Sequence, residues 1–116
     1  MTIQRLHVGP RMSQAVIHNG IVWLAGQVAT EAVPDIAGQT RQVLAAIDSL
    51  LAEAGSGKNR LLTAQIFLAD MADFAAMNKV WDAWVDAANP PARATIEAAL
   101  ARPGWKVEIV VSAAVK

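Results

Sequence analysis

The segment from Lys106 to Val115, KVEIVVSAAV, restricts the possible folds more than any other part of the sequence. Successive side chains of a β-strand point to opposite faces of its sheet. In this segment one face is entirely apolar: Val107, Ile109, Val111, Ala113 and Val115. The opposite face mixes apolar and polar groups: Lys106, Glu108, Val110, Ser112 and Ala114. The segment therefore predicts a strand with one face in a core and a second face that is only partly polar.

Apolar, β-prone segments predict further strands at residues 3–8, 15–18, 21–25, 61–69 and 95–101. The dipeptide Asn19-Gly20 lies between the second and third of these strands. It is a strong hairpin signal, because both central positions of a type I′ turn need positive φ. A turn near Arg102-Pro103-Gly104 joins the last two strands.

Two helices are predicted between these strands. The first begins after the N-cap Asp35 and ends before Gly55, which suits the position just past a helix. Its apolar stripe is Ile36, Val43, Leu44, Ile47, Leu50 and Leu51. The second begins after Asp70 and is stopped by Asn89-Pro90-Pro91. Its apolar stripe is Phe74, Met77, Trp81, Trp84, Val85 and Ala88.

The resulting order, β-ββ-α-β-α-ββ, predicts an α+β fold in which two helices cover one face of a single sheet. A chain of 116 residues suits one domain, which we expect to span residues 1–116. Hydrophobic residues make up 54% of the chain and charged residues only 17%, so few polar groups can cover its surface. We therefore expect the uncovered face of the sheet to pack against the same face of sister chains.

Composition argues against several functional classes. Ten acidic and ten basic residues balance to zero net charge and no basic block stands out, which argues against a nucleic-acid partner. No apolar run reaches the roughly 18 residues of a membrane span. Cysteine is absent, which fits a reducing cytoplasm and excludes thiolate chemistry. His7 and His18 lack the spacing and the acidic neighbours of a metal site, so no metal is expected.

Four segments carry a resemblance to a known family: PARATIEAALARPGWKVEIVVSAAV, GPRMSQAV, IVWLAGQVA and DMADFAAMNKVWDAWV. Together they resemble the YjgF/Rid family, the reactive intermediate deaminases. The resemblance implies a chorismate-mutase-like α+β fold and a homotrimer with a barrel-like centre and three sites between chains. It also implies hydrolysis of enamines and imines, such as 2-aminoacrylate, to 2-oxo acids and ammonia. This chemistry uses no cofactor.

The resemblance implies roles for two charged residues. Arg93 would hold the substrate carboxylate, since a guanidinium matches a carboxylate with two parallel hydrogen bonds. Glu108 would activate water for attack on the imine carbon and relay a proton to the leaving ammonia. The alternatives are ordinary ion pairs: a surface pair for Arg93, and a pair with Lys106 or Arg102 for Glu108.

Other substrate-binding positions follow from the same resemblance. Thr95 stands where the family usually has cysteine, and Gly26 and Gln27 match the family. Met12 replaces a common tyrosine and Ala25 a common serine, so two polar groups are missing. We expect a more apolar pocket, with room for an imino acid bulkier than 2-aminoacrylate.

Outside this set, Asn78 is expected to bond to nearby backbone, and the four tryptophans to pack in the core or at an interface.

Strand geometry tests the pairing of the two charged residues. In a simple hairpin of the last two strands, Glu108 would lie opposite Glu97, and Arg93 about 13 Å further along. Either the strands do not pair in this way, or the arginine of one chain meets the glutamate of its neighbour; we favour the second. The alternatives to an enzyme are a non-catalytic binder of small 2-oxo acids at the same cleft and a stress-linked, chaperone-like protein.

Overall fold

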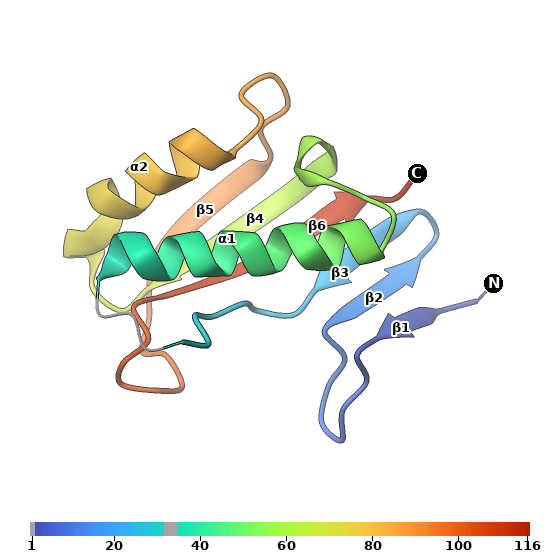
Figure 1. The fold of residues 1–116 in the computed structure, drawn as a ribbon, viewed down its shortest axis with the longest axis horizontal. Coiled ribbons are helices and arrows are strands. Elements are labelled where there is room, and N and C mark those ends of the chain that lie inside the picture. Colours follow the sequence, from blue (N-terminus) through green and yellow to red (C-terminus); the bar gives the residue numbers. More distant parts are fainter. Residues whose placement is uncertain (1, 32–34) are drawn as a thin grey trace.

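The computed structural model describes residues 2–31 and 35–116, and it has one six-stranded sheet with two helices packed on one face (Figure 1). The α+β class and the helices on a single face of a mixed sheet are therefore confirmed. The strands are β1 (Gln4–Leu6), β2 (Ala15–His18), β3 (Ile21–Leu24), β4 (Leu61–Leu68), β5 (Ala92–Glu97) and β6 (Val107–Ala114). The helices are α1 (Ile36–Glu53) and α2 (Phe74–Trp84), with short 3₁₀ turns at Lys58–Arg60 and Met71–Asp73.

The strand order in the sheet is β1-β2-β3-β6-β4-β5. Strand β6 pairs antiparallel with both β3 and β4, and it is the only connection between the β1-β2-β3 half and the β4-β5 half in the described sheet. Strand β5 pairs parallel with β4 at the edge. All the other neighbouring strands are antiparallel.

The simple hairpin considered for the last two strands is wrong, because β4 lies between β5 and β6. The predicted strand at 95–101 is also displaced: β5 covers Ala92–Glu97. Its limits come from the partner strand, since the parallel register runs from Thr63 opposite Ala92 to Leu68 opposite Glu97. Residues 98–106 then carry the chain past the end of β4.

The predicted hairpin and the first helix are confirmed in detail. Asn19 and Gly20 have φ of 51° and 77°, as a type I′ turn requires. The carboxylate of Asp35 accepts a hydrogen bond of 3.1 Å from the Gly38 N–H, which caps α1. Gly55, with φ of 78°, ends the helix in a Schellman motif: its N–H donates to Ala52 O, and the next N–H donates to Leu51 O.

The second helix is shorter than its apolar stripe predicts. It ends at Trp84, because Val85 adopts an extended backbone with φ −62° and ψ 146°. The side chain of Asp86 accepts hydrogen bonds from the Ala88 N–H and the Asn89 side chain, and so forms a local turn that competes with the helix. At the other end, Asp70 caps the 3₁₀ turn that precedes α2 rather than α2 itself.

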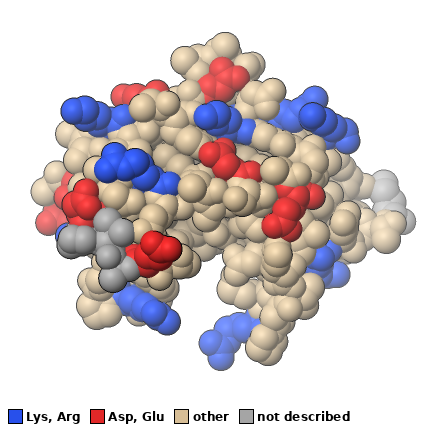
Figure 2. Space-filling model, viewed as in Figure 1, with Lys and Arg blue, Asp and Glu red and all other residues tan. Residues whose placement is uncertain are grey.

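The core lies between the helices and the sheet. On β6 the apolar face is buried, with Val107, Ile109 and Ala113 each 0% exposed. The opposite face of the sheet is bare and carries large exposed side chains, among them Trp23 at 45% and Ile96 at 51%. On the helix side, Lys and Arg are interspersed with Asp and Glu (Figure 2). Among the described residues, neither helix has the length and apolarity needed to cross a bilayer.

Candidate functional site

Glu108 lies on the bare face of the sheet, against the backbone of Gly26. Its neighbours on β6, Val107 and Ile109, face the helices, so the carboxylate points the other way and is partly buried. A Cβ built on Gly26 would overlap the Glu108 carboxylate. Within the described parts of the chain, Glu108 forms no ion pair and no side-chain hydrogen bond, so the expected alternative pairs with Lys106 and Arg102 are not formed. Its two oxygens are therefore available to a ligand or to water.

An irregularity in strand pairing brings Gly26 to this position. Trp23 lies opposite Ser112 and Gln27 opposite Ile109, so the chain advances four residues on one side and three on the other. The extra residue makes a bulge-like kink, a feature that often re-aims groups beside active sites. Two backbone hydrogen bonds of 2.9 and 3.1 Å between Gln27 and Ile109 fix the kink next to Glu108.

The side chain of Gln27 ties the loop before β2 to this segment. Its Nε2 donates to Gln14 Oε1 and to Ala25 O, both at 3.0 Å, while the Ala25 N–H donates to Gln14 O at 2.9 Å. The same loop carries Met12, whose side chain is 48% exposed. The structure thus gathers Glu108, Ala25, Gly26 and Gln27, and attaches the Met12 loop to them.

Gln14 was not identified from the sequence, although it lies within GPRMSQAV, one of the segments that carry the family resemblance.

Arg93 lies far from this group within one chain. In the parallel pairing of β5 with β4, Arg93 is opposite Ala64, which is buried on the helix side, so Arg93 projects to the helix side of the sheet. Ala64 in turn is opposite Val111, three residues from Glu108 on β6. Two strand spacings and three residues along a strand separate the two Cα atoms by roughly 14 Å. A small acid cannot contact both side chains in a single chain.

The guanidinium of Arg93 lies over an aromatic ring. Its Cζ is 5.3 Å from the ring centroid of Trp81 on α2, within the range of a cation–π contact. The expected alternative of a surface ion pair is not formed, since His7–Glu53 is the only ion pair among residues 2–31 and 35–116. Arg93 is exposed, so its charge and its N–H donors remain available.

Thr95 follows Arg93 on the same side of β5 and is opposite the buried Ile66. Its Oγ1 is buried and has no hydrogen-bond partner among the described residues, and the same holds for Oδ1 of Asn78 on α2. Within residues 2–31 and 35–116, the expected bond of the Asn78 side chain to backbone is therefore not formed through Oδ1. Two unpaired polar atoms thus lie on the two elements that carry Arg93 and Trp81, which is uncommon in protein interiors.

The bare face of the sheet is hollowed between β3 and β5. A hollow of about 510 Å³ is lined by side chains or backbone of Trp23, Thr63, Gln65, Ala92, Arg93 and Ser112. Its size is within the usual range for small-molecule pockets, but it is open to solvent in a single chain. No group of three or more metal-ligating side chains occurs among the described residues.

Comparison with known proteins gives consistent matches along the chain. The family model described as Endoribonuclease L-PSP matches residues 2–115. A RutC family protein of Haemophilus influenzae is 54% identical over 114 residues, which span 97% of this chain and 98% of that protein. The RutC family protein YoaB of Escherichia coli is 49% identical over 115 residues, spanning 99% of this chain and 100% of YoaB.

The fold also matches a crystal structure. A member of the YjgF protein family from Neisseria meningitidis superposes with a TM-score of 0.97 at 50% identity, covering 100% of this chain and 97% of that one. This chain and the Neisseria meningitidis protein therefore share one architecture, including the sheet, its two helices and the loops around Glu108.

Proposed function

Because the chain belongs to the YjgF/Rid family, whose family model is described as Endoribonuclease L-PSP, we propose that it hydrolyses reactive enamines and imines of amino acids to 2-oxo acids and ammonia. The observation that carries this proposal is a pair of charged side chains, Arg93 and Glu108, neither of which has a partner of opposite charge in the described chain. Unpaired charges of both signs suit a substrate that carries both a carboxylate and an iminium group.

Glu108 would carry out the proton transfers. An enamine first takes a proton on carbon and becomes the iminium ion. Glu108 removes a proton from water as its oxygen bonds to the iminium carbon, and the same proton then passes to the amino nitrogen. As the C–N bond breaks and ammonia leaves, the new hydroxyl group gives its remaining proton to Glu108, and the carbonyl of the 2-oxo acid remains. No electron acceptor, metal or cofactor enters this balance.

Arg93 would hold the substrate carboxylate, and the geometry favours its coming from a neighbouring chain. The two side chains are on opposite sides of one sheet and roughly 14 Å apart, so one small acid reaches both only if two copies form the site. We propose a homotrimer in which the bare sheet faces pack around a barrel-like centre. Each copy would supply Glu108 to one cleft and Arg93 to the next.

The pocket would prefer apolar imino acids larger than 2-aminoacrylate. Met12 and Ala25 bring no hydroxyl group to the site, and the Met12 loop is held to it through Gln14 and Gln27. Methionine is flexible and apolar, so it can pack against an aliphatic side chain of varied size. Thr95, Gly26 and Gln27 complete the proposed binding residues.

The decisive experiment generates imino acids in situ with an amino-acid oxidase and follows their loss by semicarbazone formation. Wild-type protein is expected to speed ammonia release, while Arg93→Ala and Glu108→Ala are each expected to lower the rate by about a hundredfold or more. Equal rates for all three proteins and for buffer alone would remove the enzymatic function.

A second candidate is a non-catalytic binder of small 2-oxo acids at the same cleft. The absence of a hydroxyl at Met12 and Ala25 favours it, because a binder needs Arg93 but not a full set of groups that polarise water. Binding of 2-oxobutanoate that is lost in Arg93→Ala, without imine hydrolysis by wild type, would identify this function. In either case we expect one domain over residues 1–116, acting in the cytoplasm.

A further inference from the structure

The contact between Arg93 and Trp81 has a direct consequence for how the proposed site binds a carboxylate. An arginine that pairs with a carboxylate of its own chain has its N–H donors occupied by that carboxylate, which also neutralises much of the positive charge of the guanidinium. A ring face attracts the cation through its quadrupole and accepts no pair of directed hydrogen bonds. At 5.3 Å from the Trp81 centroid, the guanidinium is held while its donors stay free.

Trp81 is a rigid support for this contact. It is 5% exposed and belongs to the core cluster together with Met77, one turn earlier on α2. Its ring packs on Trp84, with the centroids 5.3 Å apart and the rings tilted by 52°. A side chain that is buried on most sides keeps one rotamer, so the ring face presented to β5 is fixed.

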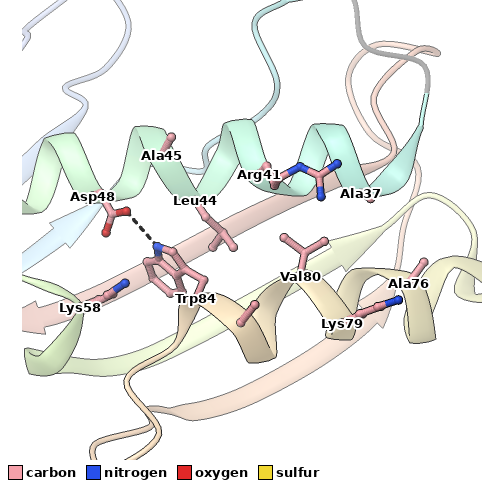
Figure 3. A pocket seen from close by; sticks show the side chains of 11 residues that line it. Ala37, Arg41, Leu44, Ala45, Asp48, Lys58, Ala76, Lys79, Val80 and Trp84 are labelled. Atoms are coloured by element: carbon pink, nitrogen blue, oxygen red, sulfur yellow. Dashed lines mark hydrogen bonds between the residues drawn. The ribbon is translucent and has the colours of Figure 1, made fainter.

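Trp84 is itself anchored between the two helices (Figure 3). Its Nε1–H donates to Asp48 Oδ2 on α1 at 2.9 Å, and Lys58 Nζ lies 5.5 Å from its ring centroid. Contacts therefore run without a gap from α1 through Trp84 and Trp81 to Arg93 on the edge strand. Edge strands have a neighbour on one side only, so an arginine there depends on such support for its position.

We propose that Trp81 is a positioning residue, which holds Arg93 without neutralising it and thereby sets the affinity of the site for a carboxylate. This role rests on the proposed function of Arg93, and Trp81 itself would not touch the substrate. Trp84, which packs on Trp81 and is hydrogen-bonded to Asp48, keeps the Trp81 ring in place.

The test compares Trp81→Leu, which removes the ring, with Trp81→Phe, which keeps a smaller one. We expect Trp81→Leu to raise KM for the imino acid, and Kd for 2-oxobutanoate, roughly threefold to tenfold, with kcat changed by less than about twofold. Trp81→Phe should fall between Trp81→Leu and wild type. Should Trp81→Leu fail to fold, Trp81→Phe alone decides the comparison.

A matched control separates positioning from packing. Met77→Ala also removes buried volume from α2 and should lower Tm, but it keeps the Trp81 ring that contacts Arg93, so its Kd for 2-oxobutanoate should equal that of wild type. Binding of the uncharged 2-oxobutanamide should be the same in all variants, because only the anion uses the guanidinium. In NMR spectra the Arg93 side-chain signals should shift when the ring is removed.

Two results would overturn the role of Trp81 alone. One is an unchanged Kd for 2-oxobutanoate in both Trp81 variants, and the other is an equal weakening in Met77→Ala. If wild type binds 2-oxobutanoate but does not hydrolyse imines, only the proposed reaction fails, and the Kd comparison still decides the role of Trp81. If wild type binds no carboxylate at all, both proposals fail together.

Discussion

The carboxylate of Glu108 occupies the space that a side chain on residue 26 would need. A Cβ built on Gly26 would overlap one carboxylate oxygen and come within 2.9 Å of Cδ and 3.1 Å of Cγ. Gly26 does not have a positive φ, so it is needed for close approach and not for a turn. The position of the Glu108 carboxylate therefore requires a residue without a side chain at position 26.

Replacing Gly26 with alanine should displace Glu108 and leave the fold intact. Because the proposed water activation needs the carboxylate in place, we expect kcat for imine hydrolysis to fall by about a hundredfold. Circular dichroism and Tm should stay near wild type. The control is Gly104→Ala, where a Cβ would meet no atom of residues 2–31 and 35–116 within 4 Å. Full activity in Gly26→Ala would contradict the proposed role of Glu108 at this position.

Mixing two inactive variants should restore activity if each site draws on two chains. Refolding equal amounts of Arg93→Ala and Glu108→Ala together should give about a quarter of wild-type activity, since that share of interfaces joins an intact arginine to an intact glutamate. The measurement is the rate of semicarbazone loss at fixed total protein. A mixture as inactive as its components would mean that both residues act within one chain.

A charge on the bare face of the sheet should block assembly. Trp23→Lys and Ile96→Lys each put an ammonium group among apolar side chains that the proposed trimer buries. Light scattering should then give the mass of a single chain. Phe74→Lys is the matched control: Phe74 is 39% exposed but lies on the helix layer, so its variant should assemble like wild type.

The hairpin turn should be sensitive to a single methyl group. Gly20→Ala forces an L side chain into φ of 77°, and we expect a loss of about 1 kcal/mol in the free energy of unfolding. Urea denaturation measures this loss. No atom of the described residues lies within 4 Å of the built Cβ, so the effect would come from the backbone alone. A gain in stability would show that the turn changes its type.

The name of the family model suggests a further test with RNA. The chain has zero net charge and mixed charges on its helix side (Figure 2), so we expect no RNA binding or cleavage at physiological salt. Fluorescence anisotropy with a labelled single strand measures binding, and gel analysis measures cleavage. Salt-dependent binding in the micromolar range would contradict this expectation.

Local signals in the sequence predicted local structure well. Asn19-Gly20, Asp35 and Gly55 each impose a conformation through their own backbone or side chain, and each behaves as predicted. The alternation in β6 identified its buried face, because burial on one side of a strand leaves a pattern of period two.

Features that depend on distant residues were not predictable in the same way. The bounds of β5 come from its register with β4, and α2 ends early because Asp86 forms its own turn. The contact of Arg93 with Trp81 joins an edge strand to a helix, and no sequence spacing encodes it. The resemblance named Arg93 and Glu108, but it could not place them on opposite sides of the sheet.

The position of β6 also bears on how the chain is made. The strand that joins the two halves of the sheet is the last of these six strands to be synthesised. While the ribosome still holds residues 107–114, the first three strands and the β4–β5 pair have no backbone bonds between them, and both expose the edges that β6 will fill. We therefore expect the sheet to close only after residues 107–114 have emerged from the exit tunnel, and the nascent chain to need protection from aggregation until then.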